Sequence, residues 1–150
     1  MVSYYHYLLA MQEKIDFLEM VRTGCHTPCK WHEHVEAWLS NPHASRMIVI
    51  KYEDLIKDAV TEMKRFCEFA DIEREESHIS MITTSASFNK LQNKERHIGM
   101  GTKHSNWQDG KLFFRRGKVG SFRDEMPEPV LQCFLDEAAQ TLKKLGYDLD

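Results

Sequence analysis

The sequence lacks the features of several specialised classes of protein. Its cysteines, Cys25, Cys29, Cys67 and Cys133, are few and irregularly spaced, which argues against a disulfide scaffold and is typical of a reducing compartment. No run of about 18 apolar residues exists to span a bilayer, and the N-terminus lacks the basic and apolar stretches of a signal peptide. We therefore expect a cytoplasmic protein that has no membrane partner.

An excess of positive charge is also missing. The chain carries 20 basic and 23 acidic residues, which gives a net charge of -3. Proteins that bind polynucleotides usually spread positive charge over a whole face, so we expect no nucleic-acid partner. No internal repeat or low-complexity tract is present, and 150 residues with 42% apolar side chains are typical of one domain or a piece of one. We expect a single domain over residues 1–150.

The apolar residues recur chiefly with helical spacing. We expect helices over residues 3–15, 16–24, 32–40, 59–70, 75–84 and 127–145. Residues 93–109 are mostly polar, with two glycines and little periodicity, which predicts a loop. The exception is residues 47–52, where an apolar, β-branched run predicts a short strand that is covered on both faces. The expected fold class is therefore mainly α with one short β-strand.

Basic residues gather in one short segment. Residues 111–123, Lys-Leu-Phe-Phe-Arg-Arg-Gly-Lys-Val-Gly-Ser-Phe-Arg, hold five cations and two glycines without one acid. Glycines leave backbone amides accessible, and guanidinium groups bind phosphate with two parallel hydrogen bonds, so the segment predicts a phosphate-binding site. Such a local patch suits a phosphomonoester. The alternative is a solvated turn with basic residues on its surface.

This segment resembles the Arg-Lys-Gly-x-x-Gly-Asp-Trp-Lys signature of sulfotransferases, which use 3'-phosphoadenosine 5'-phosphosulfate (PAPS). Further stretches resemble family motifs in the expected order: Val-Ser-Tyr-Tyr-His at 2–6, Trp-His-Glu-His-Val-Glu-Ala-Trp at 31–38, Ile-Val-Ile-Lys-Tyr-Glu-Asp-Leu at 48–55 and Ser-Phe-Asn-Lys-Leu at 87–91. Several ordered motifs are far more specific than any one alone, and the resemblance covers the whole chain. Residues 121–123, Ser-Phe-Arg, replace the usual Asp-Trp-Lys.

The resemblance implies that seven residues bind PAPS or its product, adenosine 3',5'-bisphosphate. Arg115, Arg116 and Gly117 would hold the 3'-phosphate, and Arg116 stands where the family usually has lysine. The other residues are Ser3, whose hydroxyl would reach the same phosphate, and Tyr52, Ser87 and Phe88, which would lie near the adenine. Alternatives remain for all four, since Ser3 and Ser87 suit helix starts and the two aromatic residues suit a core.

Two elements of the family have no match here, namely the phosphosulfate-binding loop and the catalytic histidine. The resemblance therefore implies a partial α/β P-loop-like sulfotransferase domain that lacks its N-terminal half, with no catalytic residue assigned. In the family a sulfuryl group passes from PAPS to a hydroxyl or amine acceptor, and residues 31–38 would line the acceptor side. The rival interpretation is a catalytically inactive nucleotide-binding or assembly module. A lone strand has exposed edges, so we expect a homo-oligomer or a partner that covers it.

A metal site is the second alternative. Five potential ligands lie within ten residues: Cys25, His26, Cys29, His32 and His34. Zinc accepts such ligands, but structural zinc sites usually combine two separated ligand pairs. Pro28 also restricts how one short stretch can converge on a metal ion. We therefore expect no metal in the site.

Overall fold

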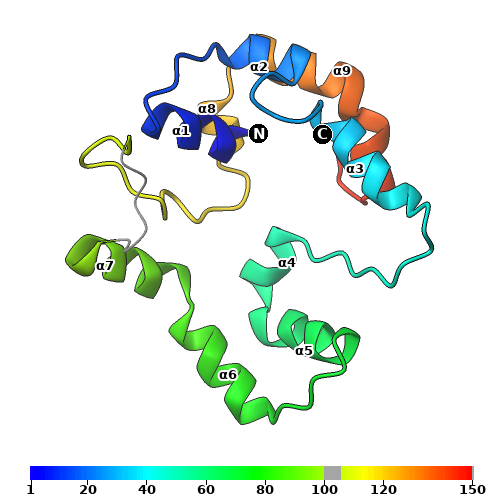
Figure 1. Cartoon of the computed structure of the whole chain (residues 1–150), viewed down its shortest axis with the longest axis vertical. Coiled ribbons are helices and arrows are strands. Elements are labelled where there is room, and N and C mark those ends of the chain that lie inside the picture. Colours follow the sequence, from blue (N-terminus) through cyan, green and yellow to red (C-terminus); the bar gives the residue numbers. More distant parts are fainter. Residues whose placement is uncertain (100–105, 150) are drawn as a thin grey trace. The chain divides into compact units, whose positions relative to one another are not determined.

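The computed structural model describes residues 1–99 and 106–149, which fold into helices and connecting loops (Figure 1). They form two compact units. Unit 1 consists of Met1–Ser45, Asn106–Gln108 and Phe122–Asp150, and unit 2 of Arg46–Ser105 and Asp109–Ser121. Within the described ranges, no helix combines the length and the apolar character that crossing a membrane requires.

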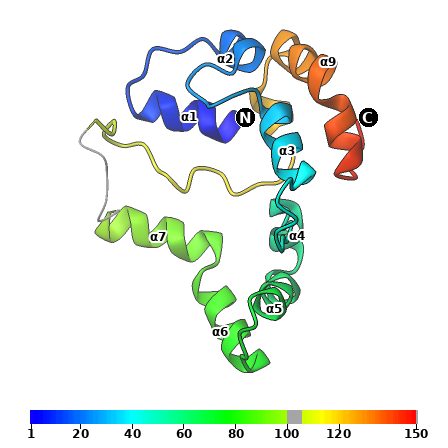
Figure 2. The ribbon, with the colours of Figure 1, turned by 45° about the vertical axis from the view of Figure 1, so that its right-hand side comes forward.

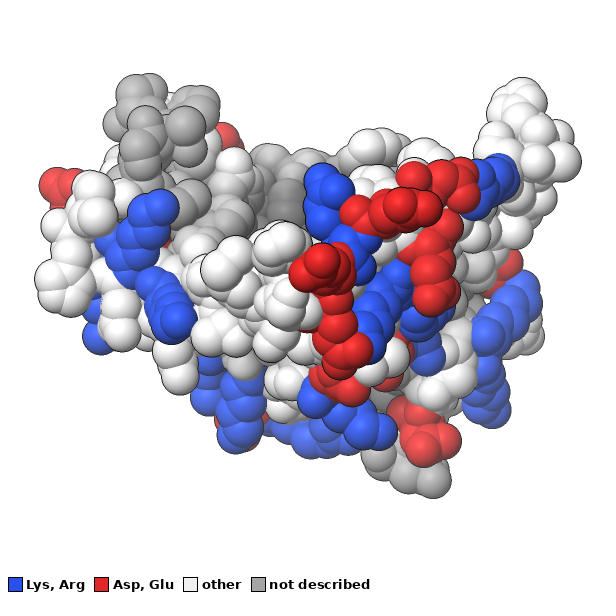
Figure 3. All heavy atoms as spheres, turned by 90° about the horizontal axis from the view of Figure 1, so that it is seen from below, with Lys and Arg blue, Asp and Glu red and all other residues white. Residues whose placement is uncertain are grey.

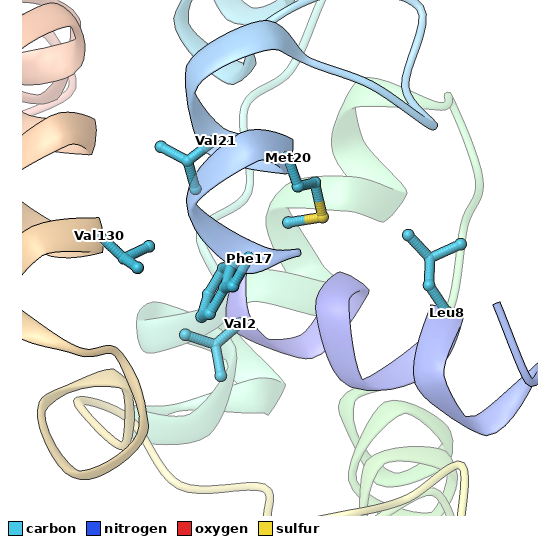
Figure 4. Close-up of a cluster of buried hydrophobic side chains, with 6 residues drawn as sticks. All are labelled: Val2, Leu8, Phe17, Met20, Val21 and Val130. Atoms are coloured by element: carbon cyan, nitrogen blue, oxygen red, sulfur yellow. The ribbon is translucent and has the colours of Figure 1, made fainter. Parts of the chain in front are cut away.

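Unit 1 is built around helices at the two ends of the chain. It contains α1 (Val2–Ala10), α2 (Phe17–Thr23), α3 (Trp31–Ser40), α8 (Phe122–Glu125) and α9 (Glu128–Lys144). Figure 4 shows the buried side chains that α1, α2 and α9 contribute to its core, which are Val2, Leu8, Phe17, Met20, Val21 and Val130. Burial of apolar surface in this cluster is what holds the first and last helices together.

Polar contacts and an aromatic pair join α3 to α9. The Lys30 ammonium lies 2.7 Å from the Glu137 carboxylate, just before α3 begins. Further along α3, the Glu36 carboxylate accepts hydrogen bonds of 2.8 Å from the Thr141 hydroxyl and from the Lys144 ammonium. The ring centroids of Trp31, at the start of α3, and Phe134, on α9, lie 5.3 Å apart. These contacts therefore hold the first part of α3 against the middle and end of α9.

Unit 2 contains four helices: α4 (Tyr52–Lys57), α5 (Ala59–Phe69), α6 (Glu76–Ser85) and α7 (Phe88–Ile98). Helices α5 and α6 pack against each other, as Figure 2 shows. The two helices and the loop between them form an open apolar pocket of about 180 Å³, lined by Met63, Phe66, Cys67, Ile72, Arg74, Ile79 and Ile82. Helix α7 follows α6 after a short break and lies next to the basic segment described below.

The prediction of a strand at residues 47–52 is wrong for the described chain. Tyr52 is the first residue of α4, and residues 47–51 belong to no helix or strand, although the backbone of Lys51 is extended. A strand exists only where its backbone pairs with another strand, and no described residue forms one. Met47 and Val49 are 41% and 43% exposed, so the apolar run is not covered on both faces.

Most of the predicted helices are present in the structure. Helices α2, α3, α5, α6 and α9 lie within a few residues of the predicted bounds, and the first predicted helix ends earlier, at Ala10. Asp16 caps α2 by accepting a 2.8 Å hydrogen bond from the Glu19 amide. The predicted loop at 93–109 is wrong where α7 continues to Ile98, and residues 100–105 of it lie outside the described residues.

Candidate anion-binding site

The basic segment is held against α7 by a buried carboxylate. Glu95 is 4% exposed. Its Oε1 accepts a 2.8 Å hydrogen bond from the Phe113 amide, and its Oε2 accepts one of 3.0 Å from the Phe114 amide. Two consecutive backbone amides thus satisfy both oxygens of one side chain. Hydrogen bonds to an ionised acceptor are stronger than neutral ones, so this contact fixes the start of the basic segment.

A second side chain of α7 holds the next two residues. The Gln92 amide nitrogen donates to the carbonyl oxygen of Phe114 at 2.5 Å and to that of Arg115 at 3.2 Å. Gln92 lies one helical turn before Glu95, so both side chains project from the same face of α7. Together they bind four backbone groups of residues 113–115.

The third contact between α7 and the segment is apolar. The Phe88 ring lies against Gly117, so closely that a Cβ added at Gly117 would overlap the ring. Gly117 also has φ +61°, in the left-handed region that glycine adopts most easily. The rings of Phe88 and Phe114 meet edge to face, with centroids 6.2 Å apart. The structure thus brings together Phe88 and Gly117, two of the predicted site residues.

Arg115, whose carbonyl Gln92 binds, and Arg116 lie between Phe114 and Gly117. Arg115 is half-buried and Arg116 is exposed. Two consecutive guanidinium groups on a backbone held from one side form a donor set that matches the oxygens of a phosphate group. On the face that Figure 3 draws, Lys and Arg side chains lie among Asp and Glu side chains and do not cover the face.

The remaining predicted residues lie on other elements. Ser87 is the N-cap of α7, and its carbonyl accepts the Leu91 amide at 3.0 Å, which agrees with the interpretation that it starts a segment. Tyr52 is 48% exposed at the start of α4, where partial burial and the nearby Glu53 charge raise the pKa of its phenol. Ser3 is exposed in the first turn of α1, in unit 1. Roles for these three residues stay predictions.

Sequence reasoning missed Gln92 and Glu95. Both lie in or next to a stretch of polar residues that carries little apolar periodicity. Their spacing from Phe88, four and seven residues, is the signal that could have placed all three on one helix face. A buried face that contains polar side chains escapes a search based on apolar residues alone.

The metal alternative gains no support from the geometry. Cys25, His26, Cys29, His32 and His34 all belong to the described residues. Throughout the described ranges, no three side chains of His, Cys, Asp or Glu gather in a way that could hold a metal ion. His32 instead lies 4.0 Å from the Glu137 carboxylate.

Comparison with known proteins identifies the family. The family model described as "Sulfotransferase domain" matches residues 1–146. The chain therefore belongs to the sulfotransferase family, and the prediction from the ordered motifs is confirmed.

Similar proteins support the assignment to the sulfotransferase family. Mouse "Sulfotransferase 1E1" is 26% identical over 149 residues, which are 95% of this chain and 50% of the mouse protein. "Cytosolic sulfotransferase 12" of Arabidopsis thaliana is 33% identical over 106 residues, 68% of this chain and 31% of the plant protein. The chain thus spans half or less of the length of these relatives.

A solved structure shares the fold. Retinol dehydratase, in complex with androsterone and the inactive cofactor PAP, matches 99% of this chain with a TM-score of 0.75 and 26% identity, over 45% of its own length. The chain therefore has a partial sulfotransferase fold. Its described part is mostly helical.

Proposed function

We propose that this chain supplies the 3'-phosphate and adenine side of a PAPS site, in a protein that transfers a sulfuryl group to a hydroxyl or amine acceptor. The observation that carries the proposal is the arrangement of Arg115, Arg116 and Gly117 on a backbone held by α7. Gly117 lies where a Cβ would overlap Phe88, so the backbone approaches closely there. The donor set fits a phosphomonoester.

The family and its solved relatives support the choice of nucleotide. The chain belongs to the sulfotransferases, and the related retinol dehydratase was crystallised with PAP. When bound, PAPS would supply the sulfuryl group. This chain's residues would bind and orient the nucleotide, with the two arginines and Gly117 on its 3'-phosphate and Tyr52, Ser87 and Phe88 near its base. Ser3 is proposed to donate to the same phosphate.

The first test is a calorimetric titration of the chain with adenosine 3',5'-bisphosphate, with adenosine 5'-monophosphate as the control ligand. We expect measurable affinity only for the ligand that carries the 3'-phosphate. Equal affinity for the two ligands would show that the 3'-phosphate does not contribute to binding. If neither ligand binds, this chain does not form the proposed nucleotide site.

A catalytically inactive nucleotide-binding or assembly module is the second candidate. The two candidates differ in one observable. Incubation with PAPS and a panel of phenols, alcohols and amines releases adenosine 3',5'-bisphosphate at an acceptor-dependent rate only if the chain transfers the sulfuryl group. We propose small acceptors and a cytoplasmic location for the active form.

A further inference from the structure

Helix α7 determines the direction of the peptide groups in the basic segment. The carbonyl oxygens of Phe114 and Arg115 both point toward the Gln92 amide. In a trans peptide the N–H points opposite to the C=O of the same plane. No peptide bond among the described residues is cis. The N–H groups of Arg115 and Arg116 therefore point away from Gln92.

Glu95 acts on the two preceding peptide groups in the opposite sense. Its carboxylate draws the N–H groups of Phe113 and Phe114 toward α7. The direction of the N–H groups thus reverses between Phe114 and Arg115, at the point where the guanidinium groups begin. A bound anion is stabilised by N–H groups and destabilised by carbonyl oxygens that face it. By turning two carbonyls toward α7, the helix presents N–H groups on the other side of the segment.

The choice of side chains supports a positioning role. A buried carboxylate is costly unless it is hydrogen-bonded, and apolar residues usually fill a buried helix face. Here Glu95 is buried and both of its oxygens bind backbone amides of the same segment. A carboxylate has only acceptors and a carboxamide nitrogen has only donors, so the two side chains match the two sets of backbone groups that they meet.

We propose that Glu95 and Gln92 are positioning residues, which orient the peptide groups of residues 113–116 so that the segment binds the 3'-phosphate. The proposal rests on the proposed function and deepens it. Neither side chain touches the nucleotide. They act through the backbone conformation of Arg115 and Arg116.

The test uses substitutions that keep side-chain shape. Glu95→Gln replaces one acceptor oxygen with an NH₂ group that faces a backbone N–H. Gln92→Met removes the donors. Glu68→Gln and Gln140→Met are the matched controls, since both residues are exposed and lie outside the segment. Circular dichroism first establishes which variants keep the helical signal of the wild-type chain.

The readout is the ratio of the affinities for adenosine 3',5'-bisphosphate and adenosine 5'-monophosphate. A positioning role predicts that Glu95→Gln and Gln92→Met each lower this ratio about tenfold or more, the effect of losing a hydrogen bond to a charged group. The affinity for the monophosphate and the controls should stay at the wild-type level. A purely structural role would lower both affinities alike, and that result would overturn the proposal.

Amide hydrogen exchange tests the same geometry without any substitution. In the wild-type chain we expect the Phe113 and Phe114 amides to be protected before ligand is added. The Arg115 and Arg116 amides should gain protection with the bisphosphate and not with the monophosphate. Binding of the bisphosphate without this gain would overturn the positioning role and leave the proposed function standing. A wild-type chain that does not distinguish the two ligands would overturn both.

Discussion

At the scale of single residues, Gly117 carries two constraints that can be separated. Its φ of +61° disfavours any side chain, and its Cα faces the Phe88 ring closely enough that a Cβ would overlap it. Gly110 has the same kind of backbone, with φ +77°, but a Cβ there would meet nothing within 4 Å. Substitutions at Gly117 and Gly110 can therefore separate the effect of the Phe88 contact from the cost of a side chain at a left-handed position.

We predict that Gly117→Ala lowers the affinity for adenosine 3',5'-bisphosphate by about tenfold or more, because Phe88 and the segment must move apart. Gly110→Ala should cost only the left-handed strain, about 1–2 kcal/mol, in the free energy of unfolding. Calorimetric titration and thermal unfolding of both variants are the measurements. Equal effects of the two substitutions on binding would contradict the role given to the Phe88 contact.

Arg115 offers a direct test of the phosphate site. The residue is half-buried and its backbone is held by Gln92, and its guanidinium would give a bound phosphate charge-assisted hydrogen bonds. Arg115→Ala should weaken binding of adenosine 3',5'-bisphosphate by ~1.5–3 kcal/mol, the range for hydrogen bonds to charged groups. Arg74→Ala is the matched control, because Arg74 is an exposed arginine on another part of unit 2. If Arg115→Ala leaves the affinity unchanged, Arg115 does not bind the phosphate.

At the scale of secondary structure, sequence patterns predicted the helices whose buried face is apolar. Helix α9 is an example, because Pro129 near its start and Gly146 after its end mark its bounds, and Val130 and Ala138 are buried on it. Helix α7 was partly missed because Gln92 and Glu95 occupy its inner face. Their burial depends on the backbone of residues 113–115, which are distant in the sequence. The local spacing can place these residues on one helix face, but it does not show which distant segment buries that face.

The cap of α2 yields a stability prediction. The Asp16 carboxylate accepts the Glu19 amide at 2.8 Å, and Gly24 ends the helix with φ +70°. Helix α2 buries Phe17, Met20 and Val21 in the core of unit 1. Asp16→Ala should therefore lower the free energy of unfolding by about 1 kcal/mol, whereas Asp16→Asn should keep most of the cap. Urea unfolding followed by circular dichroism measures both, and equal losses would refute the capping role.

The contact between α3 and α9 should depend on pH. Hydrogen bonds from Lys144 and then from Thr141 lower the pKa of Glu36 below its ordinary value of 4.5. A lowered pKa in the folded state contributes stability above the unfolded value and loses it as the pH falls through the folded value. We expect the wild-type chain to lose thermal stability faster than Glu36→Gln below about pH 4.5.

Glu128→Gln is the control for this pH series, since Glu128 is an exposed glutamate in the first turn of α9. It should follow the wild-type curve. Parallel curves for the wild-type chain and Glu36→Gln in this acidic range would show that the Glu36 contact does not contribute to the loss of stability.

At the scale of the whole molecule, the order of the motifs along the chain was enough to predict the family. It also predicted a site that includes Phe88 and Gly117, which contact each other although they are far apart in the sequence. The expected strand failed for a different reason. The side chains of residues 47–52 suit a strand, but pairing requires a second strand, which the described residues do not provide. The sequence of residues 47–52 shows that their side chains suit a strand, but it does not show whether a second strand is present to pair with them.

The exposed apolar residues lead to the last prediction, which concerns self-association. Most of the exposed large apolar side chains among the described residues lie in unit 2, and they include Met47, Val49, Ile56, Met81 and Ile82. Exposed apolar surface, here partly on a segment that belongs to no helix or strand, favours association with another chain. We expect sedimentation equilibrium to show a dimer or larger species whose population rises with protein concentration.

The double variant Met47→Thr, Val49→Thr should shift this equilibrium toward the monomer, because it removes apolar surface from residues 47–49 and leaves β-branched side chains at both positions. Trp38→Thr is the control, since Trp38 is 65% exposed but lies in unit 1. If the segment mediates association, the control remains associated while the double variant dissociates. A compact monomer at every concentration of the wild-type chain would show that these side chains need no partner, and equal shifts in both variants would place the association elsewhere on the surface.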